Sequence, residues 1–521
     1  MRRPSPRGLV GGLLLAGLAL VVVRCAWISD DGFISLRVVE NVLAGRGLTW
    51  NVDERVQVFT HPLWLLVATA ACAVTRELQF TVFAVQIVTS LAAAALLAFG
   101  IARTTAATAA SLALLVVSKP FVDYSTSGLE NPLSHLLLVV FLLAWFRSDE
   151  EPGALFGLGL AGGLAMLDRY DLALVVLPPL AVRLLGRPGR LRLAAAAAAI
   201  LPLAAWLAFA TVYYGFPLPN TAYAKLGTGL TAADLAPQGL LYVRNLVTRS
   251  PVTAIVVLAG LAESLRRPRA TGAVGLGVLL YVGYTVRVGG DFMSGRFFTV
   301  PFVCGLALLA RSSLARPGLK LGVPLAVVLA VGLAWPRSPV WSGKAYGSAG
   351  AADWDLESGI TDERAVYYPS TGLLNVPWGA RLPDHRWVEE GREARLSGQA
   401  VVYQKGIGLF GLAAGPTVHV VDAHALADPL LARLPISTDH WRIGHFIRNA
   451  PRGYLETLAS GRNQIQDEDL AQFYDRLSLV IRGRIWSAAR FRTILGFQLG
   501  RYDHFVRSWV ERRRARRERP D

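Results

Sequence analysis

Charged residues are scarce in this sequence, and the shortage excludes a class of protein. Only 17% of the 521 residues are charged, whereas a soluble globular chain carries about 25%. Hydrophobic residues make up 53% of the chain. They gather in runs such as 191–213, which reach the roughly 20 residues needed to cross a bilayer. The sequence therefore excludes a soluble globular protein and predicts a polytopic α-helical membrane protein.

Cysteine is scarce as well. Cys25, Cys72 and Cys304 all lie in apolar runs, without the spacing of a metal site or the setting of a disulfide. We interpret them as small core residues.

A metal signature is also missing from the predicted outer loops. An enzyme using nucleotide sugars would carry a DxD motif there, and the match at Asp353–Asp355 lies in the C-terminal region instead. No metal or other cofactor is assigned, although a divalent cation shared by Asp30, Asp31 and Asp291 stays compatible with the sequence.

The apolar runs define the candidate spans, which are 8–27, 61–75, 80–101, 105–118, 131–146, 153–167, 171–186, 191–213, 251–264, 271–286, 297–310 and 319–335. The first follows a basic start without a clear cleavage site, so we interpret it as an uncleaved span. Run 61–75 is short and begins at His61 and Pro62. Three apolar runs lie between residues 60 and 121, but an even number of crossings is required there. We therefore assign 61–75 as re-entrant or interfacial, which leaves about 11 transmembrane helices.

Loop charge sets the orientation. The loops 183–192, 266–269 and 311–320 are basic and belong on the cytoplasmic side. Counting from them places 121–130, 168–171, 214–250 and 287–296 on the outer, periplasmic side of an inner membrane. An N-terminus held inside by Arg2, Arg3 and Arg7 places 28–60 on the outer side too. The net charge of +16 follows this topology and the basic tail at 512–519, so no nucleic-acid partner is predicted.

Two domains follow from the change in composition. Residues 1–335 form the transmembrane domain, with 28–60 as its first periplasmic loop. Residues 336–521 are rich in Gly, Pro, Trp and charge, with alternating apolar stretches at 400–403 and 418–421. This pattern predicts a periplasmic α/β soluble domain.

The first outer loop carries two adjacent carboxylates at the predicted membrane surface. Ser29, Asp30 and Asp31 each suit the N-cap of a helix over 32–45. A carboxylate at this depth is costly, which makes a function the default hypothesis. A carboxylate can accept the proton of a substrate hydroxyl group. The alternative explanation for the two acids is that they only cap the helix.

The helix over 32–45 has two faces. Its apolar side chains share one face, and Arg37, Glu40 and Asn41 share the other. This pattern predicts a helix that lies in the plane of the interface.

Seven stretches resemble one known family, and they occur in its order. They are DDGFISLRVVENVLAGRGLTWN (30–51), THPLW (60–64), SGLENPL (127–133), YYGFPLPNTAYAK (213–225), VGGDFMSGRFF (288–298), DPLLARLP (428–435) and WRIGHFIRNAPRGY (441–454). The chain is similar to the C-type glycosyltransferases (GT-C), which use lipid-phosphate sugars. It most resembles the terminal β-(1→2)-arabinofuranosyltransferases of mycobacteria, some of whose bacterial relatives carry the name flagellar motor control protein.

The resemblance has implications and limits. It implies decaprenyl-phosphoryl arabinofuranose as donor, a cell-envelope glycan such as arabinan as acceptor, and Asp30 or Asp31 as the catalytic acid–base. The mycobacterial members keep the anomeric configuration of the donor, and a retaining route would change the carboxylate's role from a simple base. The chain departs from the family at 168–171 (DRYD) and at 424–427 (HALA). These departures bear on the sugar and the acceptor rather than the reaction class.

The phosphate of a polyprenyl donor gains charge as its bond breaks, so cations beside it stabilise the departing group. Arg287 and Arg296 flank Asp291 in a short glycine-containing outer loop. Snorkelling with an Arg–Asp pair is the alternative explanation. Arg169, Lys225 and His61 are further candidates for phosphate binding, and Asp291, Glu130 and Tyr223 complete the predicted site. Trp441 and Tyr403 are candidate sugar platforms in the soluble domain.

Three other functions fit parts of the pattern. A transporter of lipid or sugar would place charges deep within spans and show inverted repeats, whereas the acids here lie mainly at loop edges. A non-catalytic envelope or motility-assembly protein would tolerate Asp31→Asn. Transfer of another sugar to another envelope glycan would keep the same site.

Overall fold

The computed structural model describes residues 5–147, 152–185, 189–311, 318–347, 358–437 and 441–517. The chain divides into two compact units. The first contains Met1–Ser29, His61–Leu203 and Thr231–Pro383, and the second contains Asp30–Thr60, Ala204–Leu230 and Asp384–Asp521. These boundaries differ from the predicted division after residue 335, which stays a prediction about where the membrane part ends.

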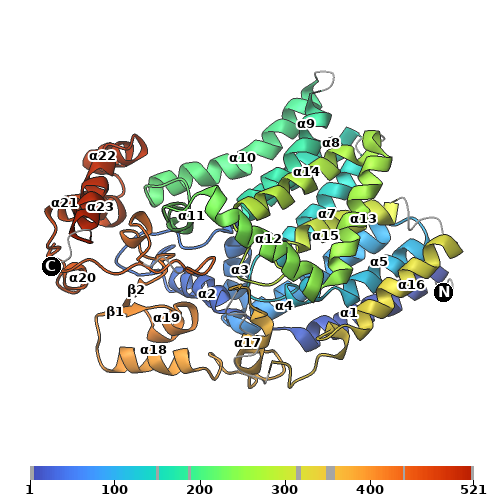
Figure 1. The fold of residues 1–521 in the computed structure, drawn as a ribbon, viewed down its shortest axis with the longest axis horizontal. Helices are drawn as coiled ribbons and strands as arrows, with labels where there is room; N and C mark the ends of the chain where they lie inside the picture. The colour runs from blue at the N-terminus through green and yellow to red at the C-terminus, as the bar shows by residue number, and fades with distance from the viewer. Residues whose placement is uncertain are drawn as a thin grey trace. The chain divides into compact units, whose positions relative to one another are not determined.

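The first unit is built from helices (Figure 1). They are α1 (Pro6–Cys25), α3 (Pro62–Thr75), α4 (Gln79–Ala95) with the π-helix η1 (Leu96–Ile101), α5 (Thr105–Val117), α6 (Lys119–Asp123), α7 (Asn131–Arg147), α8 (Pro152–Asp168), the 3₁₀ turn η2 (Tyr170–Leu172), α9 (Ala173–Leu184), the first part of α10 (Arg190–Tyr213), α12 (Ala232–Arg249), α13 (Pro251–Arg266), α14 (Pro268–Arg287), α15 (Thr299–Arg311), α16 (Leu319–Ala334), η3 (Pro339–Trp341) and α17 (Glu363–Thr371).

Most of these helices coincide with the predicted apolar runs, because a helix satisfies every backbone hydrogen bond within its own segment when no water is available. Within the described residues, four helices are long and apolar enough to span a membrane. A fifth span results if α12 and α13, which meet at 109°, are counted as one. The chain is thus a mostly helical, multi-pass membrane protein, and the figure of about 11 crossings stays a prediction.

Small residues let these helices approach closely. An added Cβ at Gly159 would lie 2.1 Å from the Ala195 carbonyl oxygen, and one at Gly163 would lie 2.5 Å from that of Ala198. The two glycines are four residues apart on α8 and both face α10, which is the small-xxx-small pattern of membrane helix pairs.

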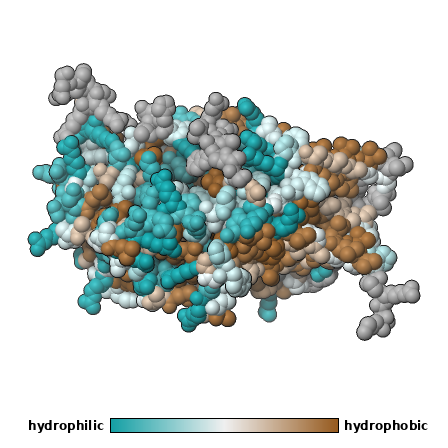
Figure 2. Space-filling view, turned by 90° about the horizontal axis from the view of Figure 1, so that it is seen from below, coloured by the Kyte–Doolittle hydropathy of each residue, from teal (hydrophilic) through white to brown (hydrophobic). Residues whose placement is uncertain are grey.

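Hydrophobic side chains also cover outer surfaces of this unit. Leu13 of α1 is 68% exposed and Val323 of α16 is 59% exposed. Figure 2 shows hydrophobic residues gathered toward the end of the visible face where α1 and α16 lie. Surfaces of this kind suit contact with lipid.

The second unit is mixed. It contains α2 (Asp30–Leu43), the end of α10, α11 (Asn220–Leu226), α18 (Arg386–Leu396), β1 (Val401–Gln404), α19 (Gly408–Ala414), β2 (His419–Asp422), η5 (Leu431–Arg433), α20 (Tyr454–Ser460), α21 (Glu468–Arg482), α22 (Ala488–Gln498) and α23 (Asp503–Arg517). The two alternating stretches predicted from the sequence form β1 and β2, which pair in parallel with Val401 opposite His419.

The interval 214–250 is the main difference from the predicted elements. We predicted an outer connection there, but it contains α11 and the 18-residue helix α12. Thr231 and Asp234 form a capping box at the start of α12, which is a recognisable start signal. Pro237 and Gly239 within its first turns obscured the helical pattern.

Candidate active site

The turn before α7 has an unusual backbone. Ser127 and Gly128 have φ values of 75° and 78°, and a left-handed conformation is uncommon for a residue other than glycine. Gln86 holds the turn, since its Oε1 accepts from Gly128 N at 3.0 Å. Trp64 Nε1 donates to the Gly128 carbonyl at 3.0 Å. These contacts fix the position of Glu130, the residue that precedes α7.

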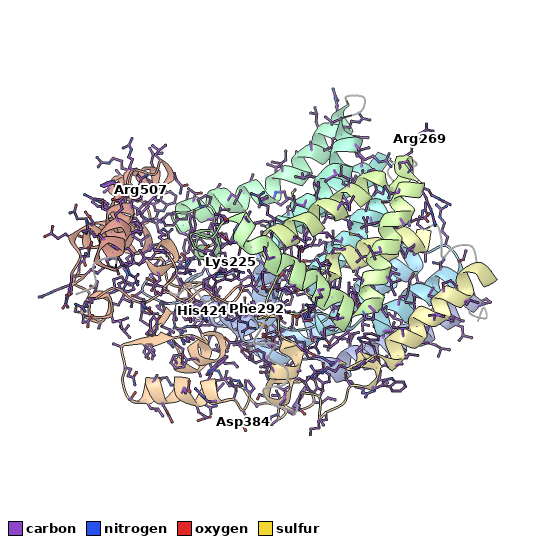
Figure 3. All side chains as sticks on the ribbon, in the orientation of Figure 1. Lys225, Arg269, Phe292, Asp384, His424 and Arg507 are labelled. Carbon is purple, nitrogen blue, oxygen red and sulfur yellow. The ribbon has the colours of Figure 1, made fainter. Side chains whose placement is uncertain are left out.

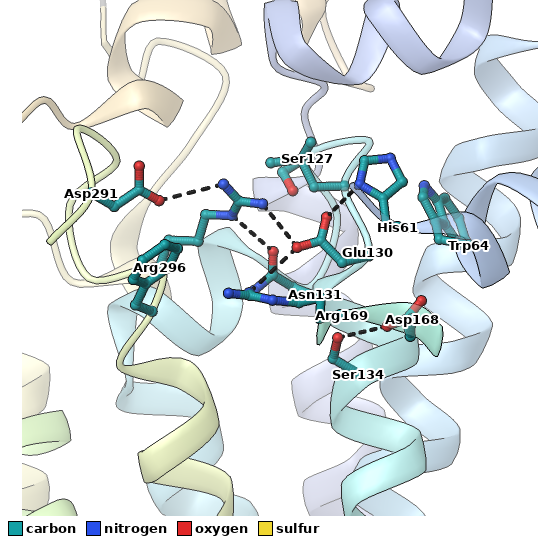
Figure 4. A network of polar contacts seen from close by, with 12 residues as sticks. His61, Trp64, Ser127, Glu130, Asn131, Ser134, Asp168, Arg169, Asp291 and Arg296 are labelled. Atoms are coloured by element: carbon teal, nitrogen blue, oxygen red, sulfur yellow. Dashed lines mark hydrogen bonds and ion pairs between the residues drawn. The ribbon is translucent and has the colours of Figure 1, made fainter. Parts of the chain in front are cut away.

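Glu130 is the centre of a buried network of charged side chains (Figure 4). Its Oε1 lies 2.8 Å from Arg296 Nη2 and 3.4 Å from Arg169 Nη1. Its Oε2 lies 3.1 Å from His61 Nδ1. Arg296 extends the network, because its Nη1 lies 3.4 Å from Asp291 Oδ2. Burial opposes the charge on Glu130, but Arg296, His61 and Arg169 together hold its pKa well below the usual range.

The structure thus brings together five predicted site residues from four separate segments. Ionised groups are expensive to bury at membrane depth, so such a network points to a function. We call these five residues the Glu130 network.

Both arginines of the network are already engaged by protein groups. Arg169 binds Asp171 with two hydrogen bonds, of 3.0 and 2.5 Å, and donates to the Tyr281 hydroxyl at 3.1 Å. Arg296 Nε donates to Asn131 Oδ1 at 3.3 Å. A phosphate would have to displace a carboxylate from either guanidinium. The geometry therefore favours a positioning role for Arg169 and Arg296, and phosphate contact by them stays a prediction.

The loop that carries Arg296 packs against protein through its glycines. A Cβ at Gly290 would lie 2.5 Å from Tyr242 Cβ, and one at Gly295 would lie 2.6 Å from Pro120 Cγ. The close approach that these two glycines allow is therefore to protein atoms. Arg287 is separate from the Glu130 network, exposed at the end of α14.

Asp30 caps a helix other than its own. Its Oδ2 accepts from Gly408 N at 3.0 Å and its Oδ1 from Leu409 N at 2.7 Å. These amides begin α19. Of the three candidates for the N-cap of α2, Asp30 therefore caps a different helix. Gly408 is required for this approach, because a Cβ there would lie 1.8 Å from the Asp30 carbonyl oxygen. Burial raises the pKa of Asp30 to about 7, against the lowering effect of these backbone hydrogen bonds. Asp31, the next residue, is partly exposed.

Two residues of the polar face predicted for α2, Arg37 and Asn41, are buried, whereas Glu40 is partly exposed. Arg37 is 2% exposed, stacks 4.2 Å from the Trp50 ring and donates to the carbonyls of Gly415 and Val418. Asn41 donates to the backbone of the 49–50 segment. Protein therefore covers Arg37 and Asn41 on the face that was predicted to be polar. The sequence alone indicated solvent because these acceptors are backbone carbonyls without a motif.

Lys225 and Tyr223 belong to α11 in the second unit, not to the unit of the Glu130 network. Lys225 is exposed, and both Lys225 and His424 lie within electrostatic reach of His445. Figure 3 labels Lys225 and His424. The two imidazole rings are 4.8 Å apart. Burial, with nearby cations including Lys405 and Arg442, lowers the pKa of His424 to about 4. Sequence reasoning missed this pair, because isolated histidines in loops carry no spacing signal.

The predicted sugar platforms are partly buried. Tyr403 donates its hydroxyl to the Arg448 carbonyl at 2.5 Å, and Trp441 packs 5.8 Å from Phe446. Asp353–Asp355 lies outside the described residues. Within the described ranges, no three His, Cys, Asp or Glu side chains are grouped as metal ligands.

The seven family-like stretches fall into two groups in space. THPLW, SGLENPL and VGGDFMSGRFF meet at the Glu130 network of the first unit. The others meet in the second unit, where Asn220 Nδ2 donates to the carbonyls of Ala425 and Asp428, and Arg448 Nε to that of Leu434. Tyr214 donates to the Leu48 carbonyl at 3.0 Å.

Comparison with known proteins gives a consistent result. No family model matches the chain. The protein named terminal β-(1→2)-arabinofuranosyltransferase from Mycobacterium tuberculosis is 30% identical, over 80% of this chain and 80% of the relative. The protein of the same name from Corynebacterium glutamicum is 27% identical, over 80% of this chain and 72% of the relative.

Proposed function

The chain belongs to the family of the terminal β-(1→2)-arabinofuranosyltransferases and is a glycosyltransferase, and from this premise we propose that it transfers arabinofuranose from decaprenyl-phosphoryl arabinofuranose to an arabinan end of the cell envelope. The observation that carries the proposal is the 30% identity to a protein of that name over four fifths of both chains. The donor is proposed because the resemblance to this family implies it, and a multi-pass membrane enzyme suits a lipid-linked sugar.

We place the reaction on the outer side of the inner membrane. The support is the distribution of loop charge, since the basic loops belong inside and the acidic residues of the predicted site lie in the loops between them. The same reasoning gives about 11 crossings and a periplasmic location for the C-terminal soluble domain, which would bind the glycan acceptor.

Asp31 is the proposed base. In the net reaction the acceptor hydroxyl oxygen bonds to the anomeric carbon, the hydroxyl proton passes to a carboxylate, and the bond from that carbon to the phosphate breaks to release polyprenyl phosphate. The anomeric configuration of the product decides whether Asp31 takes this proton as a simple base, as in an inverting displacement, or acts within a retaining route. Both oxygens of Asp30 already accept backbone hydrogen bonds, so Asp30 suits the role of fixing the start of α2. Asp31 is partly exposed and can meet a substrate hydroxyl.

The Glu130 network is the proposed support of the donor site. Two residues of the first unit contact the turn before α7: Ser29 N donates to the Ser127 carbonyl at 2.9 Å, and His61 pairs with Glu130 at 3.1 Å. Arg287 is the proposed phosphate ligand of the first unit, because it is exposed and stands outside the network. Lys225 is its proposed counterpart in the second unit.

The test uses purified protein in lipid nanodiscs with a synthetic arabinan acceptor. Decaprenyl-phosphoryl [¹⁴C]arabinofuranose is compared with a uridine-diphosphate sugar, and the product's linkage and anomeric configuration are read by NMR. We expect label in acceptor only from the lipid donor. Transfer from the nucleotide sugar, or from neither donor, would refute the proposed donor.

A further inference from the structure

A second polar site lies in the first unit, and no residue of the Glu130 network lines it. It is a cavity of about 220 Å³ whose charged lining residues are Lys119, Arg249, Arg337 and Asp362. The lining therefore carries three permanent cations against a single carboxylate.

The carboxylate is fully occupied by protein groups. Asp362 Oδ2 lies 3.1 Å from Lys119 Nζ and 3.3 Å from Arg337 Nη1, and it accepts from the Tyr346 hydroxyl at 2.7 Å. These partners, with Arg364 nearby, hold the pKa of Asp362 far below its usual range, although burial opposes its charge. Asp362 thus stays ionised, and Lys119 and Arg337 balance its negative charge.

Arg249 supplies the uncompensated charge. It is the last residue of α12 and exposed, and within the described part of the chain no carboxylate pairs with it. Neutral donors stand beside it in the lining. Ser294 Oγ donates to Asn245 Oδ1 at 2.6 Å, which leaves the two N–H groups of that carboxamide for a ligand's oxygens. Cationic and neutral donors together suit a phosphate.

The elements around the cavity have the marks of a membrane boundary. The apolar helix α16 ends immediately before Trp335, which lines the cavity and is 37% exposed. Helix α12 exposes Leu240 to 61% and Val247 to 51%. Tryptophan and arginine at the end of an apolar helix are typical of the interface. A surface helix with exposed apolar residues suits the same depth.

We propose that this cavity binds the phosphate group of a membrane lipid, with Arg249 and the Asn245 carboxamide on the phosphate oxygens and the positive charge of Arg337 beside them. The site is separate from the proposed donor site, and the proposal does not depend on the sugar that the enzyme transfers. The phosphate has two possible sources, an anionic phospholipid or a polyprenyl phosphate.

Native mass spectrometry of the full-length protein tests the proposal by counting retained lipids. Wild type, Arg249→Gln and Arg337→Gln are compared with Arg244→Gln, a matched control on the exposed side of α12 that does not line the cavity. Each is titrated with phosphatidylglycerol, decaprenyl phosphate, phosphatidylcholine or inorganic phosphate. Each removed charge is expected to weaken binding by about fivefold, with Arg244→Gln close to wild type.

The titrations with different lipids distinguish the two possible sources of the phosphate. Retention of phosphatidylglycerol identifies a bulk phospholipid, and retention of decaprenyl phosphate alone identifies the polyprenyl lipid. Either result, with the loss in Arg249→Gln, supports the proposal. Equal losses in Arg249→Gln and Arg244→Gln, binding of inorganic phosphate without either lipid, or no difference from phosphatidylcholine would overturn it.

Discussion

Replacing Asp30 by Asn should loosen one defined helix start. Asp30 is 8% exposed, and its carboxylate accepts from the amides of Gly408 and Leu409. Asparagine keeps one acceptor and turns an NH₂ group toward the other amide, which leaves a buried N–H unsatisfied. Such a loss costs about 1–3 kcal/mol, which corresponds to a roughly 5- to 150-fold faster local exchange of that amide hydrogen.

Hydrogen exchange of the peptide spanning 404–415 measures this effect, with Asp31→Asn as the matched control. We expect Asp30→Asn to accelerate exchange at the start of α19 and Asp31→Asn to leave it close to wild type. Unchanged exchange in Asp30→Asn, or equal acceleration in both variants, would refute the role assigned to Asp30.

Three further perturbations probe the rest of the site. Glu130→Gln leaves Arg296 without its closest carboxylate in a buried setting, so stability in detergent should fall by about 3–5 kcal/mol; an unchanged melting temperature would contradict the network. Burial opposes the charge of His419, but Glu54 and Asp53 raise its pKa above the usual 6.5. The protonated His419 therefore stabilises the fold fully below about pH 6.5, and this stabilisation is lost as the pH rises through the raised pKa. Urea unfolding of wild type should show that loss, and His419→Gln should abolish it. Gly408→Ala should destabilise the protein by several kcal/mol through its clash with Asp30, whereas Gly17→Ala, with open space around it, should not.

The helices of the membrane part could be predicted because their cause is local. An apolar run must form a helix in lipid, and the predicted runs and the observed helices agree closely. Helix α12 was missed because Pro237 and Gly239 interrupt its pattern, and the lining of the cavity at Arg249 was missed with it.

The candidate site could be predicted only as separate residues. His61, Glu130, Arg169 and Arg296 were each proposed from their own loop, but no local pattern indicates that they meet at one carboxylate. Likewise, the sequence around Asp30 indicates a cap for the helix that it begins. Its hydrogen-bond partners, Gly408 and Leu409, instead lie 378 and 379 residues further along the chain. Contacts of this range depend on the tertiary fold.

The most direct test compares initial rates of arabinofuranose transfer for wild type, Asp31→Asn and Asp31→Glu, each verified to unfold at the same temperature. Loss of a positioned base costs about 10²- to 10⁴-fold in rate, so we expect Asp31→Asn to fall by at least about a hundredfold and Asp31→Glu to recover part of the rate. Equal rates for wild type and Asp31→Asn would contradict the assignment of proton transfer to the first outer loop.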